Sequence, residues 1–374
     1  MNRISLLKTF ISFLTILCKD IKIGFFLFLI TLLVSQSVTI ALNLKTGSLA
    51  KWDAGWYASI MEYGYHEGNN LDGQSNYAFF PLLPLTAKLI QTVIGSREGF
   101  ALVAVSRFFL LGSIFLFMIF VREQNPKVPA WVSGGTVAFN PYSIYGHTGY
   151  TETLFLFLFL CVLISFTHKR YILAGIFGAL LTATRIPGIF LFVSFLLTCI
   201  PTFLKETQEN RMSMFLFFCL FPLGIALFSA HLYAVTGDAL AWKHIMAAYG
   251  WAREPNNPFL HLVNGLRKCS FENSWGIWNI IYCIIIILSF LLIILLFARK
   301  RFSLALFSLF ATIIPLSTGL ASMPRYISLQ VGYLLLVSEF LYHSKLYFIV
   351  FPLGLILQAI FIYMWLSDNG VYII

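Results

Sequence analysis

The chain has 374 residues, of which 59% are hydrophobic and 11% charged, and its mean hydropathy is +0.85. Soluble domains carry about 25% charged residues, so this composition excludes a water-soluble globule, a disordered chain and a disulfide scaffold. The net charge of +10 could indicate nucleic acid binding, but the positions of the charges along the chain favour a membrane topology instead.

Apolar segments recur along the whole sequence, many of them long enough to cross a bilayer. They lack the alternating pattern of a membrane barrel, which favours α-helices that satisfy their backbone hydrogen bonds within each span. We therefore predict one all-α polytopic membrane domain over residues 1–374, with about eleven transmembrane helices. The expected spans are 23–43, 101–121, 129–147, 152–167, 171–184, 187–204, 212–234, 277–298, 302–320, 326–342 and 346–366.

The distribution of charge predicts an orientation. With the N-terminus in the cytoplasm, every short cytoplasmic turn holds at least one Lys or Arg, and most acids fall on the other side. The long loops 44–100 and 235–276 then face the exoplasm. We expect no cleavable signal peptide, because residues 4–18 lack a small-residue cleavage site. The six cysteines show no pairing pattern or zinc spacing, so we expect no disulfide framework and no metal site.

The first long loop opens with KWDAGWYASIMEYGY, residues 51–65. On a helix, Asp53, Trp56 and Tyr57 share one face. Two interpretations stay open: Asp53 caps an interfacial helix within an aromatic belt, or it is a reactive carboxylate held between aromatic walls. The following NYAFFPLLPLTAKLI, residues 76–90, predicts a short re-entrant or interfacial helix, because its prolines disfavour an unbroken span.

Three polar residues stand at junctions between expected spans. Glu152 begins a helix after the break at Asn140-Pro141, where it could simply cap that helix with Thr151. Arg185 in TATRIPG and Arg325 in SMPRY could snorkel to water or could bind a phosphate bidentately.

Charged residues also occur inside the second expected span and in the second long loop. Arg107, inside the second expected span, is expected to pair internally. The second long loop carries TGDALAWKHIMAAYGWARE, residues 236–254, in which Lys243, His244 and Arg253 could contact an acidic ligand or could be solvated loop charges. Its aromatic residues, like those of the first loop, suit a membrane interface.

Six motifs occur in a characteristic order. They are WDAGWYASIMEYGY at 52–65, NYAFFPLLPL at 76–85, NPYSIYGHTGYTETLF at 140–155, ATRIPG at 183–188, TGDALAW at 236–242 and MPRY at 323–326. Their order and spacing resemble those of PIG-V-like mannosyltransferases. This resemblance implies a GT-C superfamily glycosyltransferase: a polytopic helical bundle with a helical first exoplasmic loop, a catalytic acid in that loop and a polyprenyl-phosphate sugar as donor. It implies a location in a bacterial plasma membrane, or in the endoplasmic reticulum membrane of a eukaryote.

The resemblance also implies roles for residues. Asp53 corresponds to the catalytic acid and would act as general base, while Arg185 and Arg325 correspond to positions suited to the donor phosphate. The donor is a co-substrate, no cofactor or metal is expected, and a hydroxyl of a glycan, glycolipid or protein acceptor would attack C1 of the donor sugar with inversion. The expected partners include the lipid bilayer and exclude nucleic acid. The expected substrate-binding residues are Trp52, Trp56, Tyr57, Tyr150, Glu152, Arg185, Asp238, Arg325 and Tyr326.

Two other functions remain possible at this point. One is a non-enzymatic transporter or flippase of lipid-linked saccharides, and the other is a degenerate homologue that only scaffolds a glycosylation complex. Transporters usually contain broken helices at the midplane and inverted repeats. Here the polar motifs gather at one expected membrane face, which favours chemistry at the surface.

Overall fold

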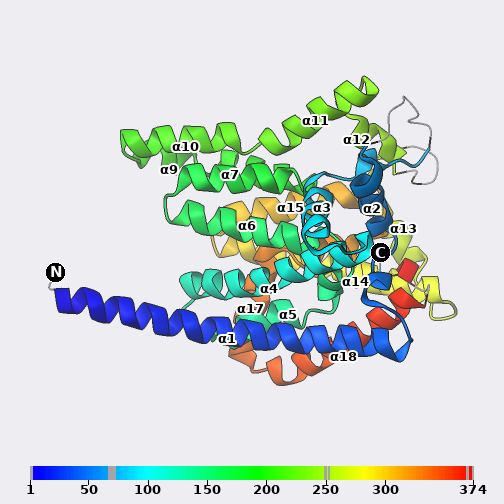
Figure 1. The fold of residues 1–374 in the computed structure, drawn as a ribbon, viewed down its shortest axis with the longest axis horizontal. Helices are drawn as coiled ribbons and strands as arrows, with labels where there is room; N and C mark the ends of the chain where they lie inside the picture. Colours follow the sequence, from blue (N-terminus) through cyan, green and yellow to red (C-terminus); the bar gives the residue numbers. More distant parts are fainter. Residues whose placement is uncertain (1–2, 66–72, 248–250, 252, 368–369, 373–374) are drawn as a thin grey trace.

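A computed structural model describes residues 3–65, 73–247, 251, 253–367 and 370–372. Within these ranges the regular structure is entirely helical, with no strands. Figure 1 shows the long helices side by side, with α2, α12 and α13 together at one end and the N-terminus projecting at the opposite end. The predicted all-α architecture is thus confirmed for the described residues.

Five helical segments are long and apolar enough to cross a membrane. Each has at least 18 residues, the length that a hydrocarbon core requires. They are Cys18–Ala41 within α1 (Arg3–Ala41), α4 (Glu98–Gln124), Gln208–Thr236 formed by α10 (Gln208–Leu220) with α11 (Leu223–Thr236), α14 (Ser274–Ala298) and α18 (Tyr347–Leu366).

The remaining expected spans contain shorter or broken helices. A bend of 99° separates η3 (Pro141–His147) from α6 (Glu152–Thr167), and the pair counts as a sixth span if taken together. The shorter apolar helices are α3 (Leu82–Ile94), α7 (Tyr171–Thr182), α8 (Pro187–Thr198) and α15 (Phe302–Leu316). Each of the eleven expected segments is helical at least in part, but five or six spans is the number that length and composition support.

Short helices connect these elements. They are η1 (Thr46–Leu49), α2 (Asp53–Tyr63), η2 (Asn76–Ala78), α5 (Ala130–Ala138), α9 (Ile200–Lys205), α12 (Ala241–His244), η4 (Ile245–Ala247), α13 (Pro258–Arg267), α16 (Met323–Ile327), α17 (Val331–Ser344) and η5 (Gly370–Tyr372). Of the first long loop, α2 and α3 confirm the two predicted short helices.

A polar network joins α1, α4, η3 and α18 inside the bundle. The Arg107 Nε atom lies 3.3 Å from His147 Nδ1, and the other ring nitrogen lies 3.1 Å from Thr31 Oγ1. Thr31 in turn donates to Gln358 at 2.7 Å. The predicted internal pairing of Arg107 is thus confirmed, and the network satisfies polar groups that would be costly to leave unpaired in lipid.

Candidate active site

Helix α2 places Asp53 at its first turn, directly after a strained residue. Trp52 adopts φ 56°, which is unfavourable for a residue with a Cβ atom, and such strain is concentrated at functional sites. The backbone N–H of Asp53 donates to the Tyr150 hydroxyl at 3.1 Å. The Asp53 side chain points to another element of the fold, where its carboxylate accepts a hydrogen bond from Arg325.

Three other segments bring charged residues to Asp53. Glu152 is the first residue of α6 and follows Gly149, whose φ of 75° suits the sharp bend. Arg185 lies between α7 and α8, where Pro187 starts the next helix. Arg325 lies in the short helix α16, which begins after Ser322 at φ 68°.

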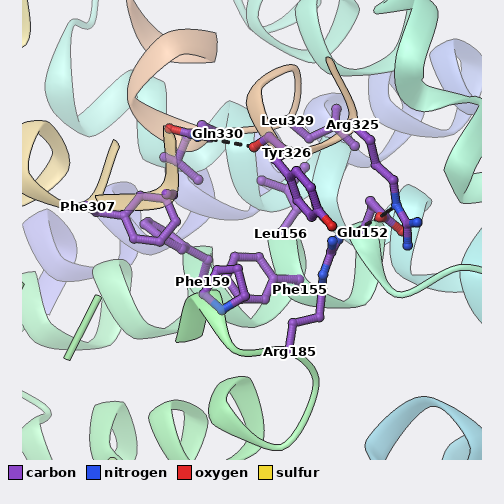
Figure 2. Close-up of a pocket in the computed structure, with 13 residues that line it drawn as sticks. Glu152, Phe155, Leu156, Phe159, Arg185, Phe307, Arg325, Tyr326, Leu329 and Gln330 are labelled. Carbon is purple, nitrogen blue, oxygen red and sulfur yellow. Dashed lines mark hydrogen bonds and ion pairs between the residues drawn. The ribbon is translucent and has the colours of Figure 1, made fainter. Parts of the chain in front are cut away.

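These side chains form one ion-pair network, of which Figure 2 shows Glu152, Arg185 and Arg325. Arg325 Nη1 lies 2.6 Å from Asp53 Oδ2, and Arg325 Nε donates to Glu152 Oε1. Arg185 Nη1 lies 2.6 Å from the same Glu152 oxygen. The Arg325 guanidinium also stacks over Tyr150, 4.4 Å from its ring centroid. The network thus links residues that are up to 272 positions apart in the sequence.

Exposure separates the two carboxylates. The side chain of Glu152 is 2% exposed and that of Asp53 is 26% exposed. Glu152 is therefore enclosed between its two arginines, whereas Asp53 is accessible to a bound molecule. Asp53 is the better candidate for chemistry, and Glu152 for holding the arginines in place.

Two cavities lie beside the network and share Arg185, Arg325 and Tyr326. The larger, of about 160 Å³, is lined by Asp53, Tyr57, Phe79 and Phe80 together with residues of the second long loop. The smaller, of about 40 Å³, continues between α6, α15 and α17; its mainly apolar wall is Phe155, Leu156, Phe159, Phe307, Leu329 and Val331 (Figure 2). One polar cluster therefore lies between a cavity of mixed lining and a mainly apolar one.

Aromatic side chains form the wall of the larger cavity. The ring centroids of Trp56 and Trp251 are each 5.9 Å from that of Phe79, and 5.9 Å from each other. Tyr57 packs edge-on against Phe79 at 5.2 Å. Burial, and next the charge of Asp53, raise the pKa of the Tyr57 hydroxyl, which keeps it neutral at physiological pH. Such a wall could stack against a sugar ring.

The predicted site residues fall into three groups. Lining a cavity are Asp53, Tyr57, Glu152, Arg185, Arg325 and Tyr326. Two more contact residues of the site without lining a cavity. Trp56 stacks on Phe79 of the cavity wall, and the ring of Tyr150 packs against the Arg325 guanidinium.

Trp52 and Asp238 line neither cavity. Trp52 is 43% exposed, and Asp238 pairs at 2.7 Å with His244, whose hydrogen bond lowers the pKa of Asp238. The structure therefore gives the half-buried Asp238 a local partner in His244 and no place among the residues that line the two cavities.

Sequence reasoning missed Trp251 of the second long loop, which lines the larger cavity. Arg253, for which contact with an acidic ligand and a solvated position were both left open, lines this cavity as well. In the sequence, Trp251 and Arg253 look like residues of an interfacial aromatic belt. The sequence therefore carries no signal that distinguishes a cavity-lining role from an interfacial one. In the described part of the chain, no group of three His, Cys, Asp or Glu residues could hold a metal ion.

Comparison with known proteins gives structural neighbours only. No family model and no curated protein matches the sequence, so the resemblance to PIG-V-like mannosyltransferases stays a prediction. The oligosaccharyltransferase of Archaeoglobus fulgidus in its apo form aligns over 93% of this chain and 56% of its own, with 12% identity and a TM-score of 0.44. The same organism's oligosaccharyltransferase AglB, in complex with an inhibitory peptide and a dolichol-phosphate, aligns over 94% and 56%, with 11% identity and a TM-score of 0.39. This chain therefore spans about half the length of those it is similar to.

Proposed function

We propose that the protein is an integral-membrane glycosyltransferase. It transfers a sugar, mannose by the resemblance of its motifs, from a polyprenyl-phosphate donor to a hydroxyl of an exoplasmic acceptor, with inversion. The observation that carries this proposal is the Asp53–Arg325–Glu152–Arg185 network between a cavity of mixed lining and an apolar one. An accessible carboxylate beside two phosphate-binding side chains is the combination that such a transfer requires.

The transfer is a single displacement at C1 of the sugar. The acceptor oxygen forms a bond to C1 as the bond from C1 to the phosphate oxygen breaks. The acceptor proton passes to Asp53, and the bonding electron pair leaves with the phosphate. Arg185 and Arg325 bind phosphate oxygens bidentately and stabilise the charge that develops on the leaving group. A displacement on one face inverts the anomeric centre.

The two cavities suit the two ends of such a donor. The apolar cavity, walled by Phe155, Phe159 and Phe307, suits the start of a prenyl chain, which gains free energy by leaving water. The larger cavity, with its aromatic wall and Asp53, suits the sugar and the acceptor hydroxyl. The phosphate between them would then meet Arg185 and Arg325, which line both cavities.

The test uses purified protein in lipid nanodiscs, supplied with polyprenyl-phosphate mannose and other polyprenyl-phosphate sugars. We expect release of polyprenyl phosphate with one of them. General-base assistance contributes about 10²–10⁴-fold, so Asp53→Asn should lower turnover at least ~100-fold. The amide still accepts a hydrogen bond from Arg325, so the melting temperature of this variant should stay close to that of the wild type.

Glu62→Gln is the matched control, because Glu62 is an exposed acid of the same helix. It should retain full turnover. Near-normal transfer by Asp53→Asn would refute the assignment of the base. A protein that moves a lipid-linked sugar across vesicles without releasing polyprenyl phosphate would instead be the flippase that the sequence leaves open.

A further inference from the structure

Arg253 occupies a defined place in the larger cavity. Its guanidinium donates to the Tyr326 hydroxyl at 3.2 Å through Nη1 and to Ser322 Oγ at 3.3 Å through Nη2. Its backbone N–H donates to the Met246 carbonyl at 2.8 Å. Three residues further on, the Asn256 N–H donates to the carbonyl of Ser317 at the end of α15. The second long loop is thus attached to the bundle on the C-terminal side of Arg253.

The charges around the two cavities cancel only when Arg253 is left out. The charged residues that line them are Asp53, Glu152, Arg185, Arg253 and Arg325. The two carboxylates are paired with Arg185 and Arg325, and this quartet carries no net charge. Among the described residues no carboxylate forms an ion pair with Arg253, whose guanidinium contacts neutral hydroxyls only. The half-buried Arg253 therefore gives the site one positive charge in excess.

We propose that Arg253 is an anion-binding residue that makes this site select a phosphate-bearing substrate over its uncharged counterpart. This inference rests on the proposed function, in which the donor is a phosphodiester with one negative charge. As the bond to the sugar breaks, the leaving phosphate gains a second charge, so the attraction of Arg253 grows along the reaction.

The pKa of Tyr326, whose hydroxyl accepts a hydrogen bond from Arg253, reflects the same excess of positive charge. Burial raises the pKa of the Tyr326 hydroxyl, but Arg253, then Arg325 and Arg185, lower it by more, and the net pKa lies below the usual value. Arg185 also lies over the Tyr326 ring, 5.4 Å from its centroid. The hydroxyl thus stands among three guanidinium groups, where a phosphate oxygen would be stabilised for the same reason.

The test compares binding of a short-chain polyprenyl phosphate with binding of the corresponding polyprenol to the purified full chain. The wild type should prefer the phosphate. Because a hydrogen bond to a charged group is worth several-fold more than a neutral one, Arg253→Gln should reduce that preference by about ten- to a hundred-fold. Arg253→Lys keeps the charge but loses the planar guanidinium, and it should retain part of the preference.

Arg267→Gln is the control, since Arg267 is an exposed cation at the end of α13 in the same loop. It should keep the wild-type preference. A wild-type preference in Arg253→Gln, together with its loss in Arg185→Gln, would overturn this inference and leave the proposed function standing. Absence of sugar transfer in a protein whose phosphate preference still depends on Arg253 would overturn the transferase and leave the anion site standing.

Discussion

At the scale of single residues, Asp53 and Glu152 illustrate what the sequence leaves undecided. Each begins a helix, where a carboxylate is favourable whatever its function, so the sequence leaves a capping role open for both. Both pair with Arg325, which is 272 and 173 positions away, so each has a role that a cap alone does not explain. Their roles differ through burial, which depends on tertiary packing and not on local sequence.

Tyr326 supports a prediction about pH. Burial raises its pKa, but Arg253, Arg325 and Arg185 outweigh burial and bring the pKa below its usual value of 10. Deprotonation would place a negative charge beside the proposed phosphate site. Since the second pKa of a phosphate monoester is about 6, the ligand is fully ionised well below this range. Affinity for a polyprenyl phosphate should therefore fall as the pH rises from 8 towards 10.

The measurement compares the wild type with Tyr326→Phe, which cannot lose a proton. Other titrating groups act on both proteins, so the difference in slope isolates Tyr326. The affinity of Tyr326→Phe should decline less over this pH range. If affinity fell equally with pH in the two proteins, deprotonation of Tyr326 would have no effect on phosphate binding, and the prediction would be wrong.

At the scale of helices, hydropathy located the elements well. Residues 152–167 were predicted as one helix and form α6, and the predicted helix around Asp53 is α2. The expected span 129–147 is instead divided into α5 and η3, since hydropathy reports apolar length and says little about bends. The contact of Trp251 with Trp56 joins the two long loops, and no periodicity within either loop encodes it.

Close helix packing supports a second prediction. A Cβ atom at Gly224 of α11 would lie 1.9 Å from the carbonyl oxygen of Ala179 in α7. Small residues allow membrane helices to approach closely, and a backbone atom cannot move aside without separating them. Overpacking costs roughly 1–3 kcal/mol, so Gly224→Ala should lower the melting temperature in detergent by several degrees.

Gly55 offers a matched control inside another helix. A Cβ atom there would meet nothing within 4 Å, and alanine favours a helix by about 1 kcal/mol over glycine. Gly55→Ala should therefore melt at the wild-type temperature or above it. Equal melting temperatures for both variants would show that α7 and α11 are not in tight contact.

At the scale of the whole molecule, the candidate site and the basic turns lie at opposite ends. Helix α6 starts at Glu152 in the site and extends 16 residues, about 24 Å, to the turn at Lys169. Helix α17 likewise starts near Arg325 and ends before Lys345. The third of these turns, between α14 and α15, carries Lys300. All three lysines adopt a positive φ in short turns between helices, and their charge favours the cytoplasmic side.

This separation predicts the orientation of the site in the membrane. In a background that lacks the exposed Cys18 and Cys219 and the partly exposed Cys269, a cysteine at Asn256 should react with an impermeant thiol reagent added to intact cells. A cysteine at Lys300, which is equally exposed, should react only after permeabilisation. Asn256 is attached to the end of α15 beside Arg253, so its labelling reports the position of the cavity itself. The reverse pattern would place Asp53 and the arginines in the cytoplasm, where the donor sugar would have to be presented on the inner leaflet, and the exoplasmic acceptor would then be wrong.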